Sequence, residues 1–149
     1  MIVMYAVVRM RGVAGVRKEI EDTLKMLRLK SVNNCVVVPE TESYKGMLEK
    51  IKDVATYGEM EKEMLVKLLE KRGRMGSQRI DPKKLKYNSF VKIAEDMINN
   101  KIKLNDIGIN PVFRLTPPSK GFNSVKLHYP KGDLGYRGKD INNLLERMI

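Results

Sequence analysis

The chain is poor in the residues that build disulfides and zinc sites, and it has no long apolar run. It holds one cysteine, Cys35, and one histidine, His128. A single cysteine cannot form an internal disulfide, as is usual in a reducing cytoplasm, and the pair cannot build a His/Cys zinc site. No run of about 18 apolar residues is present, so no segment is expected to span a membrane. Residues 1–8 lack the basic start of a signal peptide, so none is expected.

Acidic residues are scarce, and the imbalance is uneven along the chain. There are 29 Lys and Arg against 18 Asp and Glu, a net charge of +11. Residues 1–60 carry 10 basic and 8 acidic residues, whereas residues 61–149 carry 19 and 10. Phosphates relieve the repulsion within such a block by exchanging condensed counterions for Lys and Arg, so nucleic acid is the predicted partner. The densest part of this region is residues 71–92, which we call the basic block. It contains one acid, Asp81, and the basic residues Lys71, Arg72, Arg74, Arg79, Lys83, Lys84, Lys86 and Lys92.

A membrane surface is the other polyanion to consider. A basic amphipathic membrane helix would carry its charges on one face, opposite bulky apolar residues. Residues 72–86 of this block are interrupted by Gly73, Gly76 and Pro82, and they are therefore predicted to form a loop.

The first 60 residues alternate between strand-like and helical patterns. Apolar runs at 2–8 and 35–38 predict two strands, with Cys35 as inert core, and the segment DVATYG at 53–58 predicts a third. Apolar residues at helical spacing predict one helix after residue 13 and a second, capped by Thr41 or Ser43, before the third strand. The order β-α-β-α-β predicts a compact domain over 1–60 with both helices on one face of the sheet.

Residues 61–149 are predicted to form a basic extension of this domain. Apolar stripes predict helices around 60–69, 90–98 and 141–148. Two β-like pieces, Val112–Leu115 and Ser124–Tyr129, flank a turn-rich segment at 116–121. They predict a hairpin or a projecting arm.

The segment Arg9–Gly15 joins a predicted strand to a helix start. Glycines there let a backbone approach a phosphate, and helix amides favour an anion. Neither GxxxxGK[ST] nor GxGxxG is present, so no nucleotide cofactor is predicted. A simple turn and a contact with RNA phosphate both remain open.

Two distal segments, 113–122 and 129–138, interleave aromatic, basic and turn residues. Aromatic rings and Arg planes can stack on unpaired bases while Lys meets phosphate, which favours an RNA-contacting arm. The pair Pro117-Pro118 leaves recruitment of a proline-binding domain open. His128 has no evident nucleophile or carboxylate partner, so a packed or base-stacking histidine is favoured over a catalytic base.

These motifs together resemble the large-subunit ribosomal protein L-thirty family in its long, archaeal-type form, whose eukaryotic relative is called L-seven. The first 58 residues are similar to the short bacterial-type core through VVRMRG, TLKMLRL at 23–29 and ETESYKGMLEKIKDVATYGE at 40–59. The distal signatures are FRLTPPSKGF at 113–122, HYPKGDLGYRG at 128–138 and a terminal INNLLERM helix.

The resemblance implies an α+β, ferredoxin-like core with a three-stranded antiparallel sheet and two helices, followed by the extension. It also implies a structural constituent of the cytoplasmic ribosome that binds large-subunit rRNA near the 5S rRNA, beside neighbouring ribosomal proteins. It implies no catalysis, cofactor, metal or small-molecule substrate. The resemblance, the charge pattern and the distal motifs together give these candidate RNA contacts: Arg9, Arg11, Gly12, Arg17, Arg28, Lys30, Thr41, Ser43, Lys45, Lys71, Arg72, Arg74, Arg79, Lys83, Lys84, Lys86, Arg114, Lys120, Phe122, His128, Lys131 and Arg137.

Three functional hypotheses follow. The first is a ribosomal protein that holds folded rRNA by phosphate neutralisation and shape. The second is a free-standing RNA-binding or RNA-chaperone module, for example one acting on tRNA. The third is a small ferredoxin-like enzyme for acyl phosphates, with Arg11 or Arg17 binding phosphate and Asn33 or Asn34 placing a water. The third leaves the basic block and the distal arm unexplained.

Overall fold

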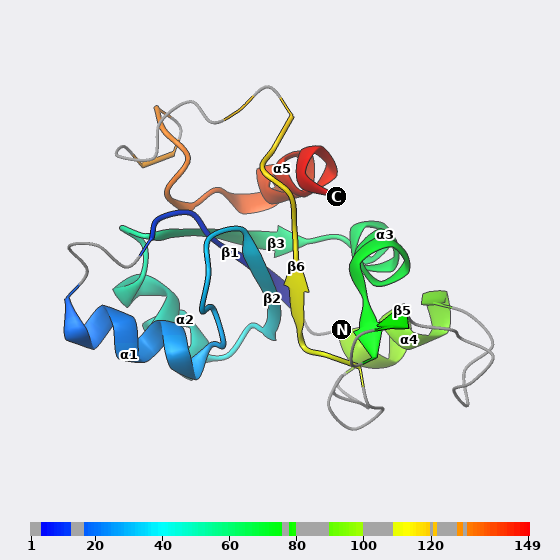
Figure 1. Cartoon of the computed structure of the whole chain (residues 1–149). Coiled ribbons are helices and arrows are strands. Elements are labelled where there is room, and N and C mark those ends of the chain that lie inside the picture. Colours follow the sequence, from blue (N-terminus) through cyan, green and yellow to red (C-terminus); the bar gives the residue numbers. More distant parts are fainter. Residues whose placement is uncertain are drawn as a thin grey trace.

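The computed structural model describes residues 4–12, 17–75, 78–79, 90–99, 109–119, 121, 128–129 and 131–149. The centre of the molecule is a five-stranded sheet in the order β6-β2-β1-β3-β7 (Figure 1). β1 (Met4–Arg9) lies in the middle and pairs antiparallel with β2 (Asn34–Pro39) and β3 (Ala55–Met60). The described helices are α1 (Lys18–Met26), α2 (Glu42–Lys50), α3 (Lys62–Arg72), α4 (Phe90–Ile98) and α5 (Ile141–Met148).

The α+β class and the three antiparallel core strands are confirmed, with boundaries that shift by one or two residues. The third strand begins at Ala55 rather than at residue 53 and continues to Met60, because residues 51–54 form a turn. Met10 N and Arg11 N both donate to Val54 O, at 2.9 and 3.1 Å, which fixes this turn against the end of β1.

Both faces of the sheet are covered, because successive side chains of a strand point in opposite directions. Tyr5 and Val7 of β1 face an apolar cluster built with α1 and α2, as predicted for these two helices. Ala6 and Val8 face a second cluster, to which α3, α4 and α5 contribute. In Figure 1, α1 and α2 lie below the sheet, α5 lies above it, and α3 and α4 lie at its right-hand end.

The second part of the chain also adds an edge strand on each side of the sheet. β6 (Val112–Arg114) pairs antiparallel with β2, and β7 (Gly135–Tyr136) pairs parallel with β3. The first piece of the predicted arm therefore belongs to the sheet, because Phe113 is fully buried against it. Residues 124–127 of the second piece lie outside the described residues. The division of the chain at residue 60 stays a prediction.

A short hairpin, β4 (Arg74–Met75) and β5 (Gln78–Arg79), follows α3. The remainder of the basic block, from 80 to 89, lies outside the described residues. This range includes Lys83, Lys84 and Lys86.

Gly58 marks the closest approach between the two parts of the chain. A Cβ atom placed on Gly58 would lie 2.1 Å from the backbone oxygen of Gly138 and 3.0 Å from Cβ of Ile141. Gly138 has φ +59°, a left-handed conformation that favours glycine. The segment entering α5 can therefore lie directly on β3 only while residue 58 has no side chain.

We predict that Gly58→Ala lowers the free energy of unfolding by about 1–3 kcal/mol, since a backbone atom must shift to admit the methyl group. The matched control is Gly46→Ala inside α2, where an added Cβ meets nothing within 4 Å. This control should gain up to about 1 kcal/mol, because alanine is the better helix former. Urea unfolding midpoints of the full chain measure both changes. An unchanged midpoint for Gly58→Ala would contradict the close approach.

Candidate nucleic-acid interface

One end of the sheet gathers loops from distant parts of the sequence. β1 ends there at Arg9, opposite Ala55 at the start of β3, and β2 begins there at Asn34, opposite Arg114 at the end of β6. Exposed cations on these loops form what we call the basic end of the sheet, made of Arg11, Arg28, Lys30 and Arg114. Exposed Gly12 belongs to the same loop as Arg11. The structure therefore brings together predicted residues that are about 100 positions apart in the sequence.

Arg17 lies near this end as well. It is the exposed residue that precedes the first turn of α1, five positions after Gly12. Its carbonyl accepts a bond from Glu21 N at 3.0 Å, while its side chain makes no capping bond. Figure 1 shows the start of α1 on the same side of the molecule as the end of β1.

Arg9 turns inward instead of facing solvent. Its side chain is only 2% exposed, and its Nε and Nη1 donate to Arg11 O at 2.9 Å and Leu29 O at 2.7 Å. Burial lowers the pKa of this guanidinium from its usual value. Arg9 thus braces the loop that presents Arg11, which corrects its predicted role as a direct contact. A signal was present in the sequence, because Arg9 is in phase with the inward-facing Tyr5 and Val7.

The loop between α1 and β2 is held by left-handed residues. Arg28 has φ +64° and Asn33 has φ +69°, a region in which asparagine is tolerated better than most residues. Asn33 N donates to Arg9 O at 2.8 Å, and Asn33 O accepts from Leu115 N at 3.1 Å. The turn at Asn33 therefore joins three loops of the basic end through backbone bonds.

Thr41, Ser43 and Lys45 lie at the opposite end of the sheet. β2 ends there, with Pro39 opposite Met4, and α2 follows. Thr41 Oγ1 accepts from Tyr44 N at 3.3 Å, which confirms the predicted cap, and Lys45 pairs with Glu40 at 2.9 Å. Thr41 and Lys45 thus already have local partners, whereas Ser43 is exposed. These residues therefore lie at the other end of the sheet from Arg11.

The described residues of the basic block are also remote from the basic end. Lys71 is exposed and Arg72 and Arg74 are partly exposed, where α3 leads into β4. Figure 1 places α3 and β5 at the right-hand end of the sheet, away from the loop after β1. Arg79 belongs to β5. Lys71, Arg72, Arg74 and Arg79 of the basic block therefore form a second region of positive charge, separate from the basic end.

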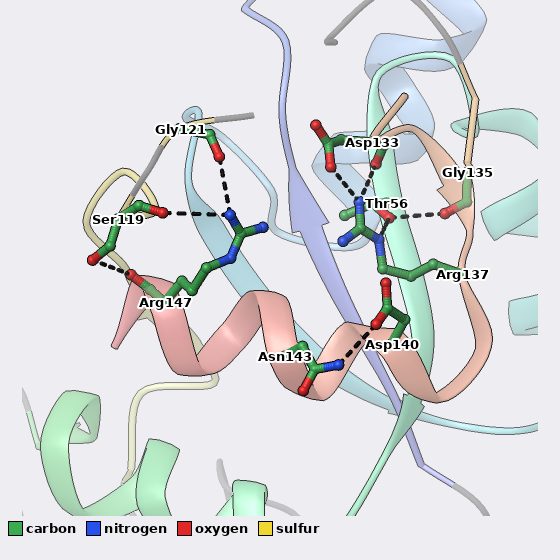
Figure 2. Close-up of polar contacts among 9 residues, drawn as sticks. All are labelled: Thr56, Ser119, Gly121, Asp133, Gly135, Arg137, Asp140, Asn143 and Arg147. Atoms are coloured by element: carbon green, nitrogen blue, oxygen red, sulfur yellow. Dashed lines mark hydrogen bonds and ion pairs between the residues drawn. The ribbon is translucent and has the colours of Figure 1, made fainter. Parts of the chain in front are cut away.

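Arg137 lies inside the protein (Figure 2). Its Nη2 donates to Asp133 Oδ1 at 2.9 Å and to Asp133 O at 3.0 Å, and its Nε donates to Thr56 Oγ1 at 3.0 Å. The hydroxyl of Thr56 in turn donates to Gly135 O at 2.9 Å. The side chains of Arg137 and Asp133 are almost fully buried, at 3% and 4% exposure. The prediction that Arg137 contacts RNA is therefore wrong, since its donors bind β3 and its own loop.

The GDLGYRG motif at 132–138 therefore holds its own segment against β3, whereas the sequence pattern favours a contact with RNA. Gly135 and Gly138 have φ of +81° and +59°, and they bend the segment 135–138 so that it lies along β3. The sequence signals were the spaced glycines and an acid four residues before an arginine. Thr56 carried no signal of its own, because its partners are about 80 residues away.

Two of the remaining distal candidates, His128 and Lys131, lie on a loop beside the turn that precedes β3. His128 is exposed and its Nε2 lies 2.9 Å from Asp53 Oδ1, beside the turn that precedes β3. Lys131 is exposed on the same loop. Lys120 and Phe122 lie outside the described residues. Figure 2 shows Ser119 and Gly121 bound to Arg147 of α5, with Arg147 Nη1 donating to Gly121 O at 3.2 Å.

Other kinds of site find little support in the described part of the chain. Cys35 is buried as predicted, and burial raises the pKa of its thiol to about 12. The described residues contain no group of three or more His, Cys, Asp or Glu placed to hold a metal ion. None of the helices described is both long and apolar enough to cross a bilayer.

We predict that Arg137→Gln lowers the free energy of unfolding by about 3 kcal/mol or more, because it leaves the Asp133 carboxylate buried without its charge partner. Arg11→Gln, at an exposed position, should change it by less than about 0.5 kcal/mol. Urea unfolding of both full-length variants provides the comparison. Equal midpoints would mean that Arg137 is not a structural residue.

Comparisons with known proteins agree with this fold. The family profile described as "Ribosomal protein L30p/L7e" matches residues 5–54. "Large ribosomal subunit protein uL30" of Archaeoglobus fulgidus is 46% identical over 151 residues, covering 97% of this chain and 99% of the relative. The proteins of the same name from Methanococcus maripaludis and Nanoarchaeum equitans are 49% and 45% identical, covering 97% and 98% of this chain and 99% of each relative. The chain is therefore a member of the uL30 family of ribosomal proteins.

Proposed function

We propose that the chain is a structural protein of the large ribosomal subunit and that it holds folded rRNA through the basic end of its sheet. The observation that carries the proposal is the convergence of exposed Arg11, Arg28, Lys30 and Arg114 from separate loops. Such a cluster suits phosphates that belong to a folded RNA, because A-form helices are recognised by shape and backbone more than by base edges. A structural role without catalysis fits the family.

The brace beneath these cations supports the proposal. Arg9 and Asn33 join the loops through bonds of 2.7–3.1 Å, so the exposed cations are displayed by a largely fixed backbone. A fixed display loses less conformational entropy on binding than flexible chains do. The second region, Lys71, Arg72 and Arg74 with the rest of the basic block, is proposed to reach other phosphates. The 5S rRNA and neighbouring ribosomal proteins stay proposed partners.

The free-standing RNA module is the alternative from the same chemistry. Sedimentation of cell extract separates the two, since a ribosomal constituent should migrate almost wholly with the large subunit. A substantial pool of the chain free of the subunit would favour the alternative.

We predict that replacing Arg11, Lys30 and Arg114 with Ala reduces the slope of log affinity against log salt for large-subunit rRNA by roughly 2–3, because each lost phosphate contact removes about 0.7–0.9. The fold should be retained, since all three side chains are exposed.

The matched control replaces Lys25, Lys62 and Lys67, which carry the same total charge but pair with Glu21, Glu95 and Glu146 on helix surfaces. Its slope should stay close to that of the unsubstituted chain. Equal slopes for the two triple variants would show that only net charge matters, and the proposed interface would then be wrong.

A further inference from the structure

Three tyrosine rings form a cluster on the face of the sheet that α1 and α2 cover. Tyr5 of β1, Tyr57 of β3 and Tyr136 of β7 have ring centroids 5.7–6.4 Å apart. Strand pairing places Tyr57 directly beside Tyr136, at the β7 edge of the sheet. Tyr5 is buried, but Tyr136 is 49% exposed. The cluster thus has a packed base and an aromatic surface open to solvent, a type of surface enriched at protein interfaces.

Carboxylates surround these rings, although the protein as a whole is strongly basic. The Tyr136 hydroxyl donates to Glu59 Oε1 at 3.1 Å, and the Tyr5 hydroxyl lies beside the Glu40 carboxylate. Burial, followed by Glu40, raises the pKa of Tyr5 to about 12, and burial with Glu59 raises the pKa of Tyr136. We call Tyr57, Tyr136, Glu40 and Glu59 the tyrosine patch.

The carboxylates of the patch are only partly compensated. Glu40 pairs with Lys45 at 2.9 Å, whereas the hydrogen bond that Glu59 receives comes from a neutral hydroxyl. None of the described cations forms an ion pair with Glu59, whose carboxylate lies beside an exposed ring. Such a site repels phosphate, so the rRNA proposed for the basic end of the sheet does not suit it.

The chemistry that fits a ring face beside a carboxylate is a guanidinium. An Arg plane stacks on an aromatic ring, and its forked donors match a carboxylate. We propose that the tyrosine patch docks an arginine-bearing segment of another protein. Only the identification of that protein as a component of the same ribosomal particle rests on the proposed function. Proteins in contact with rRNA are rich in such segments, because arginine also binds phosphate.

The first test uses the free full-length chain and a blocked peptide of alternating Arg and Gly, at low ionic strength. Binding is followed by the NMR signals of the tyrosine rings. The peptide should bind at least tenfold more tightly than a version in which citrulline, a neutral analogue, replaces every Arg. Equal affinity for the two peptides would overturn the proposal.

Variants locate this binding on the surface. Glu40→Gln with Glu59→Gln should weaken the Arg peptide at least fivefold, and Tyr136→Leu should weaken it as well. The control pair, Glu63→Gln with Glu70→Gln, removes the same charge from exposed positions of α3 and should leave the affinity unchanged. An equal loss for the two Glu pairs would attribute the binding to net charge and would also overturn the proposal.

The second test replaces Tyr136 with the photoreactive p-benzoylphenylalanine and irradiates assembled large subunits. A crosslink to an Arg-containing peptide of another subunit protein, identified by mass spectrometry, is expected. A crosslink only to rRNA would mean that the ring stacks on a base, and an incorporated but uncrosslinked chain would mean an open surface. Either result overturns the proposal. If the unsubstituted chain fails to join the subunit, the proposed function fails, while the peptide test still decides the docking site.

Discussion

The fold depends on the burial of a single strand from both sides. All six residues of β1 are buried, although its side chains point alternately to two faces. A sheet whose central strand is apolar on both faces needs a layer on each side. α1 and α2 supply one layer from the first part of the chain, and α3, α4 and α5 supply the other. The second part of the chain therefore has a structural role, because it covers the second face of the sheet.

This requirement explains why the distal motif contains a buried ion pair. The segment that leads to α5 must lie against β3 so that α5 can cover the second face. Arg137 and Asp133 are nearly inaccessible there, and two charges in such surroundings are tolerated only when both are bonded. The hydroxyl of Thr56 links the pair to β3 and to Gly135, so every element at this junction has a polar partner.

Patterns within one element were sufficient to predict most of the fold. The strand at 2–8, the cap at Thr41 and the helix at 141–148 each follow from residues close in sequence. β6 coincides with the predicted β-like piece Val112–Leu115, but its pairing with β2 could not be found in this way, because the partner strand lies far along the chain. The two-residue strand β7 could not be found either, because its own pattern is too short. The segment predicted as a hairpin or a projecting arm therefore begins with a strand of the central sheet.

The candidate site divided along the same lines. The resemblance to a known family predicted cations such as Arg11 and Lys30, and both are exposed, since a surface loop rarely hides such side chains. Whether an arginine faces solvent or a buried acceptor depends on tertiary neighbours, as Arg9 and Arg137 show. Charge density can be counted along the sequence, whereas a contact surface depends on which residues lie together in the folded protein. The basic end is assembled from loops that no single window contains.

The late position of β7 has a consequence for how the chain is made. The hydroxyl of Thr56 donates to the backbone oxygen of Gly135, which lies 79 positions later in the sequence and is therefore synthesised later. During synthesis from the N-terminus, the first three strands and two helices emerge while Ala6 and Val8 still lack the layer that covers them. Contacts of such sequence separation form slowly, because a long loop must close before they contribute. The nascent chain therefore passes through a stage with one apolar sheet face uncovered, in which it is open to aggregation unless a chaperone or its RNA partner shields that face.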